Sequence, residues 1–379
     1  MTGRPVEAAV RRRGGKGRVL LVLLAAVCLL LVIAHLLAAW RLDTAHVQRR
    51  LASAIAKRSD SLYLVRIGSA RFSLLGRSLR ITDFELLPDT AAFTRRARTR
   101  PGPHTRYLAT AASVDLDGLG LWRFFRKDLA VRSIAIDSLR VEVEVDRTKP
   151  RSPRAPAKLP HQFLQEERHT RIGQLRLTRS QVHFRQRASD GSRFGTLPFT
   201  EIEALISNVT TDPLRMSVGR PCEIDIHALF AGASRMFARF EYDLAAPQLN
   251  LAYHVSFGRM DARALNRFIV DLEGVRIREG QLDTAIFKID VRDDLAQGEL
   301  QLRYHDLEIE TLDKVSRGRD LNDAVQSFLF NNFKLQTENP ENDKPPFSAT
   351  IRYRRLPETP IFKFIWLTLR DGIFQTLDL

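Results

Sequence analysis

This chain of 379 residues contains no complete motif of a known catalytic site. The sequence contains neither a Gly-x-Ser-x-Gly nucleophile elbow nor a His-Glu-x-x-His zinc motif. The run Gly14-Gly15-Lys16-Gly17 lacks the spacing and the Ser or Thr of a phosphate-binding loop. We therefore predict no catalytic residues, no cofactor and a protein that is not an enzyme.

Candidate metal ligands are scattered along the chain. His161 and His169 flank a polar stretch, and His183 occupies the polar position of a strand pattern. Asp115-x-Asp117-Gly118 resembles the start of a calcium loop but lacks the later ligands and the closing Glu, so a tight turn explains it better. Other carboxylates alternate with basic residues, as on a solvated strand face. We predict no metal site.

Apolar residues recur at every second position over much of the chain. In Val141–Asp146 valines alternate with acids, and similar alternation runs through Ala238–Leu244, Leu249–Phe257 and Phe287–Val291. This period indicates strands with one apolar and one wet face, and a wet face favours antiparallel pairing. We therefore predict a mainly β protein built on a long antiparallel sheet, near 70 Å across for about fifteen strands at roughly 4.8 Å each.

The apolar face of such a sheet must pack on a second layer or curl around something apolar. Helical sequence is too scarce to cover all of it, and an uncovered face of this size is typical of a binding surface. The predicted groove-lining residues share alternating positions in the clearest strands. They are Phe240, Tyr242, Leu251, Tyr253, Val255, Phe287, Ile289, Leu302, Tyr304 and Ile351.

Four segments show helical spacing: Leu42–Lys57, Asp261–Phe268, Leu321–Lys334 and Ile361–Phe374. The last is amphipathic and rich in aromatic residues. It has two interpretations, a plug for the open end of the sheet or a helix that meets a membrane or partner.

Two proline-containing basic stretches, Thr94–Arg106 and Lys149–Pro160, are predicted to be loops. Alternation resumes after Lys149–Pro160. We interpret that stretch as an insertion in one continuous sheet.

The run Val19–Trp40 is apolar for 22 residues, with His35 as its only ionisable side chain. A helix of this length reaches roughly 33 Å, enough for a hydrocarbon core of about 30 Å. It exceeds the apolar region of a cleavable signal peptide, so a retained anchor is favoured over cleavage. Six basic residues precede it, which favours a cytoplasmic N-terminus.

The charge and the cysteine content indicate the surroundings of the body, which is the part of the chain after the predicted anchor. The formal net charge is +15. Beyond a membrane, anionic lipid head groups are a better counterpart for this charge than nucleic acid, although an arginine-rich proteome also accounts for it. Cys28 lies in the anchor and Cys222 in the body, so the two cannot form a bridge within one chain.

These patterns divide the chain into five parts. They are a cytoplasmic basic stub (1–18), a transmembrane helix (19–40), a helical stalk (41–60), a β domain (61–360) and a C-terminal amphipathic helix with its tail (361–379).

Three stretches resemble the AsmA-like proteins of Gram-negative envelopes. They are Leu119–Phe125 with Leu129–Val141, Gly258–Asn266 with Val275–Leu282, and Gly298–Leu312. The resemblance implies an inner-membrane protein whose periplasmic body is a curved half-pipe of antiparallel strands with an apolar groove. Larger relatives are thought to carry phospholipid between membranes or to support outer-membrane assembly, and the family has no catalytic residues.

Two functions follow as hypotheses. In the first, an inner-membrane-anchored periplasmic protein binds or transfers the acyl chains of membrane phospholipid along its groove. In the second, a non-enzymatic scaffold for outer-membrane proteins closes its apolar face with an envelope protein partner. In neither is nucleic acid a partner.

Overall fold

The structure is a computed structural model that describes most of the chain from Thr44 onward. It covers residues 44–73, 75–99, 105–120, 129–146, 148, 159, 162, 170–188, 193–210, 220–244, 246–273, 275–312, 336–340 and 345–377. The predicted anchor, Val19–Trp40, and the predicted helix Leu321–Lys334 lie outside these residues. Within them, every helix falls short of the length and hydrophobicity required to cross a membrane.

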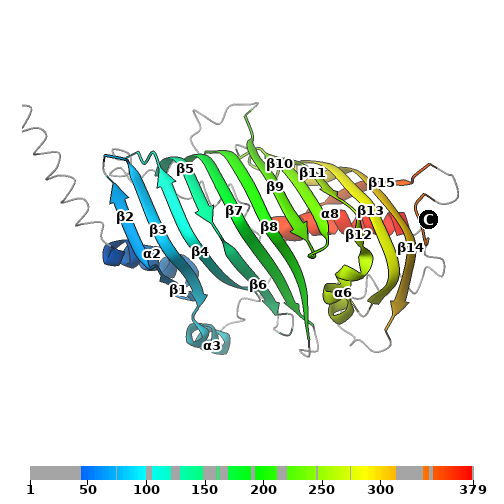
Figure 1. The fold of residues 1–379 in the computed structure, drawn as a ribbon, viewed down its shortest axis with the longest axis horizontal. Coiled ribbons are helices and arrows are strands. Elements are labelled where there is room, and N and C mark those ends of the chain that lie inside the picture. The colour runs from blue at the N-terminus through cyan, green and yellow to red at the C-terminus, as the bar shows by residue number, and fades with distance from the viewer. Residues whose placement is uncertain are drawn as a thin grey trace, which may run out of the picture.

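One sheet of fifteen strands dominates the described chain (Figure 1). The prediction of a mainly β protein with a few short helices is therefore confirmed. The strands are β1 (Tyr63–Arg66), β2 (Ser69–Ser73), β3 (Ser78–Pro88), β4 (Thr105–Asp117), β5 (Leu129–Asp137), β6 (Arg140–Asp146), β7 (Thr170–Arg187), β8 (Phe194–Thr210), β9 (Cys222–Phe230), β10 (Ser234–Tyr242), β11 (Leu251–Phe257), β12 (Met260–Asp261), β13 (Val275–Arg292), β14 (Leu295–Thr311) and β15 (Ser348–Arg354).

The fifteen strands occupy only twelve positions across the sheet. The strands β1 and β2 pair with successive parts of β3, β5 and β6 pair with successive parts of β4, and β11 and β12 pair with successive parts of β13. Each of these couples forms one interrupted line. Eleven spacings of about 4.8 Å give a sheet roughly 53 Å across, which is shorter than the predicted 70 Å.

The prediction of a purely antiparallel sheet is wrong at one place, because β7 runs parallel to β5 and β6. The other strand pairs of the described sheet are antiparallel. A parallel pair needs a crossover connection of a dozen or more residues, and the chain between Asp146 and Thr170 is long enough to provide one. This connection contains the predicted insertion Lys149–Pro160, and the strands on both sides of it belong to the same sheet, as expected.

Helices lie at one end of the sheet, at one edge of its middle, and behind the strands of its C-terminal half (Figure 1). They are α2 (Thr44–Ser59), α3 (Thr90–Thr99), the 3-10 helix η1 (Ala262–Leu265), α6 (Asn266–Glu273) and α8 (Ile361–Leu377). The first packs on the β1–β2 end, where Val47 meets Ile67 and Ile81 and the Thr44 hydroxyl accepts a hydrogen bond from Ala70 N at 3.0 Å. The described chain therefore begins with a helix that packs directly on this end of the sheet.

The predicted loop Thr94–Arg106 is wrong in its first half, since α3 continues to Thr99. Asp89 stabilises the start of this helix, because its Oδ1 accepts a hydrogen bond from Ala92 N at 2.9 Å. Phe93 is buried beside Leu62 and Ala92, and Arg106 lies over its ring at 5.0 Å. The prolines that suggested a loop, Pro101 and Pro103, come after the end of this helix, and its arginines are good helix formers.

Candidate functional site

Two rows of directly paired residues cross the whole sheet on one face. Directly paired residues of neighbouring strands point to the same side, so each row lies on a single face. The first row is Ala70, Ile81, Val114, Ile136, Leu177, Ala204, Ile226, Ala238, Val255, Phe287, Leu300 and Ala349. The second row is Phe72, Leu79, Leu116, Ile134, Leu175, Ile206, Ile224, Phe240, Tyr253, Ile289, Gly298 and Ile351.

Every member of both rows is apolar, with Gly298 as the only one that lacks a side chain. We call the surface formed by these two rows the apolar face. It continues without a polar interruption from β2 to β15. The register between strands, rather than any single strand, produces this continuity.

The row between these two points to the opposite side and is mostly charged. Its members are Arg71, Arg80, Asp115, Ala135, Arg176, Leu205, Asp225, Arg239, His254, Lys288, Glu299 and Thr350. Cross-strand ion pairs form within it, including Arg239–Asp225 at 2.6 Å and Lys288–Glu299 at 3.8 Å. Exposed pairs of this kind contribute little to stability, so they keep this face wet more than they stabilise the fold.

Helix α8 lies on the apolar face in the C-terminal half of the sheet, where it runs behind the strands toward the C-terminus and packs mainly on β14 and β15 (Figure 1). Its Phe364 is fully buried, with its ring 6.1 Å from that of Tyr353. The helix approaches closely because residue 372 is glycine, and a Cβ there would lie 2.8 Å from Ile351 Cδ1. Of the two interpretations of this segment, the described residues favour a plug for most of its length.

A buried hydrogen bond fixes the helix on the sheet. The Thr368 hydroxyl donates to the Ile365 carbonyl at 2.7 Å, so the Tyr253 hydroxyl donates to Thr368 Oγ1 at 2.6 Å. Burial raises the pKa of Tyr253, and the bond to Thr368 partly opposes this shift. This bond favours one position of the helix, since a shifted helix would leave the buried Tyr253 hydroxyl without its partner.

Six of the ten predicted groove residues belong to the two rows of the apolar face, at the end that α8 covers, and the other four lie on the same strands: Tyr242, Leu251, Leu302 and Tyr304. Phe240 is half-buried and the other nine are buried. All ten belong to the cluster that also contains Phe364 of α8 or pack against it. These residues are therefore part of the surface on which α8 packs, and their role in a groove stays a prediction.

The residues predicted from the sequence to line a groove do not include the central stretch of the apolar face. Its residues are half-buried: Leu116, Ile134, Ile136, Leu175 and Leu177. The described helices pack mainly elsewhere, α2 on β1 and β2, α6 on β8 and β13, and α8 on β14 and β15. These strands also alternate in sequence, but only their register shows that they extend the same face.

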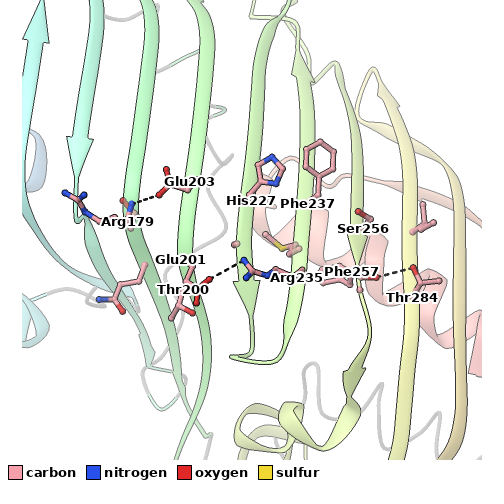
Figure 2. A pocket seen from close by; sticks show the side chains of 16 residues that line it. Arg179, Thr200, Glu201, Glu203, His227, Arg235, Phe237, Ser256, Phe257 and Thr284 are labelled. Carbon is pink, nitrogen blue, oxygen red and sulfur yellow. Dashed lines mark hydrogen bonds and ion pairs between the residues drawn. The ribbon is translucent and has the colours of Figure 1, made fainter.

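A hollow of about 1000 Å³ lies near the middle of the sheet, where charged side chains from the opposite face reach its rim (Figure 2). Its charged groups have protein partners. Glu203 Oε1 accepts a hydrogen bond from the backbone N of Arg179 at 2.9 Å, the Arg179 guanidinium pairs with Asp137 at 2.5 Å, and Arg235 Nη1 donates to Glu201 Oε2 at 3.3 Å. The ring of Phe237 lies 5.1 Å from that of His227. We assign no chemistry to this hollow, since protein partners already satisfy these charges.

The described residues contain no group of three or more His, Cys, Asp or Glu side chains placed to hold a metal ion. His183 lies on β7, directly paired with Glu142 and Pro198. Asp115 pairs with Arg80, and Gly118 turns the chain after β4 with φ 67°. The other two singled-out histidines, His161 and His169, lie outside the described residues.

Cys222 lies at the end of the apolar face that α8 covers, so the reactivity of its thiol can show whether that end opens. It is directly paired with Tyr242, and burial raises the pKa of its thiol to about 11. In a Cys28→Ser variant we expect Cys222 to stay unreactive toward a thiol reagent at pH 8 until the protein unfolds. Rapid labelling of the folded protein would show that this end opens.

The raised pKa of Cys222 also makes the stability of the folded protein depend on pH. An unfolded thiol loses its proton near its ordinary value of 9.0, while folded Cys222 keeps its proton to about pH 11. The unfolded state therefore binds fewer protons in this window, and the contribution of Cys222 to stability falls as pH rises from about 9 to 11.

Comparison with known proteins adds no family to these observations. No protein-family model matches the chain, and no curated protein matches it significantly. The resemblance to AsmA-like proteins therefore stays a prediction.

Proposed function

We propose that this chain is a membrane-anchored, non-enzymatic protein that binds phospholipid acyl chains along its apolar face and moves them within a Gram-negative envelope. The observation that carries the proposal is the continuity of the apolar face across all twelve strand positions, with α2 and α8 at its two ends. A face this long, with half-buried aliphatic side chains in its centre, is suited to an elongated apolar ligand rather than to a compact one.

The central stretch is somewhat shorter than one acyl chain. From β4 to β7 the sheet spans two spacings of about 4.8 Å, or roughly 10 Å. An acyl chain spans half of a hydrocarbon core of about 30 Å, or roughly 15 Å. In this proposal the sheet curves as a half-pipe, with its apolar face inward, so that the acyl chain leaves water while its head group stays at the rim.

The proposed location follows from the predicted anchor. Val19–Trp40 would hold the chain in the inner membrane with its body in the periplasm. Only three residues separate Trp40 from Thr44, the first residue of α2, so the β1–β2 end would lie close to that membrane. Lipid could then enter the apolar face at this end.

Photo-crosslinking in cells tests this function. A benzophenone amino acid at Ile136 or Leu177 places the reactive group on the apolar face, and the same amino acid at neighbouring Ala135 or Arg176 places it on the opposite face. We expect phospholipid adducts from the first two positions and few from the second two. Protein adducts from Ile136 and Leu177 would instead support the scaffold, and equal lipid labelling from both faces would contradict a groove.

A further inference from the structure

The strands of the sheet are irregular along one line. Asp83 on β3, Arg179 on β7 and Glu201 on β8 have a left-handed backbone, with φ of 52°, 48° and 50°. Ser138, with φ 54°, lies between β5 and β6. The register of the strand pairs places these four residues at the same level of the sheet. We call the line through them the crease.

The crease separates the sheet into two halves. The strands β1 and β2 part at Ile67–Gly68, where Gly68 N donates to the carbonyl of Thr82, the residue before Asp83. Further along, β11 and β12 part at Gly258–Arg259, and the register between β13 and β14 shifts beside Asp283. We call the half with β2, β5 and β11 the α8 half, and the half with β1, β6 and β12 the α6 half.

The two halves keep their apolar side chains on the same side of the sheet. Side chains alternate along a regular strand, so residues five positions apart point to opposite sides. Leu177 and Val182 are five apart on β7, and Phe199 and Ala204 are five apart on β8, yet all four pack in one apolar cluster. An irregular residue that bends the strand accounts for this reversal. The sheet is therefore bent at the crease.

The backbone at the crease is strained. Arg179 and Glu201 carry long side chains in a left-handed conformation, which a Cβ disfavours sterically and which Asp and Asn tolerate better. A fixed bend could use glycine, which adopts this conformation without strain. Strained residues of this kind gather where a protein binds a ligand or switches between conformations.

Open space lies beside the crease. The hollow of about 1000 Å³ is lined by Arg179 and Glu201, with Thr200 next to Glu201 and Phe257 at the end of β11 (Figure 2). Protein interiors are otherwise packed as densely as organic crystals. A strand can change its angle most readily where such space adjoins it.

Each half has a helix of its own. In the α6 half, Leu272 of α6 lies so close to Gly195 of β8 that a Cβ on this glycine would be 2.7 Å from it. In the α8 half, Thr368 of α8 shares a buried hydrogen bond of 2.6 Å with Tyr253 of β11. These contacts make each half a packed layer, with the crease between them.

We propose that the crease is a hinge, about which the α6 half turns against the α8 half and changes the width of the apolar side of the sheet. Hinges are a few residues that absorb changes in φ and ψ while the packed elements on either side stay intact. This inference goes beyond the proposed function, because it concerns a movement of the protein alone. In lipid binding, the movement would let the sheet admit a ligand and then close on it.

Pulsed double electron–electron resonance measures this movement in the full chain, purified in detergent. Spin labels at Gln174 and Arg185 lie on β7 on either side of Arg179, whereas labels at Arg176 and Lys288 lie within the α8 half. Both pairs are made in a Cys28→Ser/Cys222→Ser background, which removes both native cysteines. We expect the distance distribution across the crease to be about twice as wide as the one within the α8 half. Equal widths would overturn the hinge.

Substitution at the crease provides the second readout. Glu201→Gly removes a left-handed side chain, so it should loosen the hinge and widen the distribution across the crease further. Glu201→Val places a β-branched side chain where φ is above zero, so it should shift the maximum of that distribution. Circular dichroism establishes that each variant is folded, and Glu201→Gly decides the question if Glu201→Val does not fold.

The matched control is Glu241→Gly, at an exposed position of β10 where the pairing is regular. It should leave the distribution across the crease unchanged. The proposal is contradicted if Glu201→Gly has no effect or if Glu241→Gly has the same one. Lipid adducts at Ile136 are measured separately, so the hinge and the proposed function can fail independently.

Discussion

Replacing Phe364 by alanine should lower the free energy of unfolding by about 3–5 kcal/mol, the usual cost of removing a fully buried aromatic side chain. Phe364 is 0 % exposed and is the largest fully buried side chain of the described residues. It joins α8 to Tyr353 and to the cluster that contains the ten predicted groove residues. Urea denaturation followed by circular dichroism measures the change.

The same helix supplies the control. Phe362→Ala removes an identical side chain two residues away, at a position that is 84 % exposed, and should change the free energy of unfolding by no more than about 0.5 kcal/mol. Equal effects of the two substitutions would show that α8 does not rest on the sheet as described. Stability would then have to come from the strand pairs alone.

Placing a carboxylate in the central stretch should remove lipid binding if the proposed function is correct. We expect Ile136→Glu to reduce the phospholipid that co-purifies with the protein at least tenfold. An ionised side chain loses hydration when an acyl chain covers it, and a cost of only about 1.4 kcal/mol corresponds to a tenfold loss of affinity. Quantitative mass spectrometry of lipids extracted from the purified protein measures the result.

Two variants on the same strand separate binding from folding. Ala135→Glu places the same charge on the opposite, exposed face of β5 and should leave bound lipid unchanged. Ile136→Val keeps an apolar side chain and should bind lipid like the wild type. Normal lipid content in a folded Ile136→Glu protein would contradict binding along the central stretch.

The two predictions assign different roles to one surface. The β15 end of the apolar face is a packed core that needs Phe364, Thr368 and Gly372 to hold α8 in place. The central stretch has the same apolar residue types but half-buried ones. A protein built in this way would keep its sheet folded through its ends while its centre receives a ligand.

Local patterns in the sequence were enough to predict several elements. Alternation in Ala238–Leu244 and Leu249–Phe257 predicted strands, and the structure has β10 and β11 there. Helical spacing predicted Leu42–Lys57 and Ile361–Phe374, and the structure has α2 and α8 within about three residues of those limits. These predictions succeed because the period of apolar residues depends on the geometry of one element alone.

Other features depended on contacts between distant parts of the chain. The parallel pairing of β7 could not be predicted, since parallel and antiparallel strands share the same period of two. The loop predicted at Thr94–Arg106 failed because the Asp89 cap and the buried Phe93 outweigh its composition.

The sequence by itself determined that each strand has one apolar and one charged side, since successive side chains point to opposite faces. Only the tertiary structure decided that these sides align into one apolar face, because register between strands is a non-local property. It also decided which part of that face is filled. Tyr253 and Leu177 look alike as strand residues, but α8 lies on the first and the second is half-buried in the central stretch.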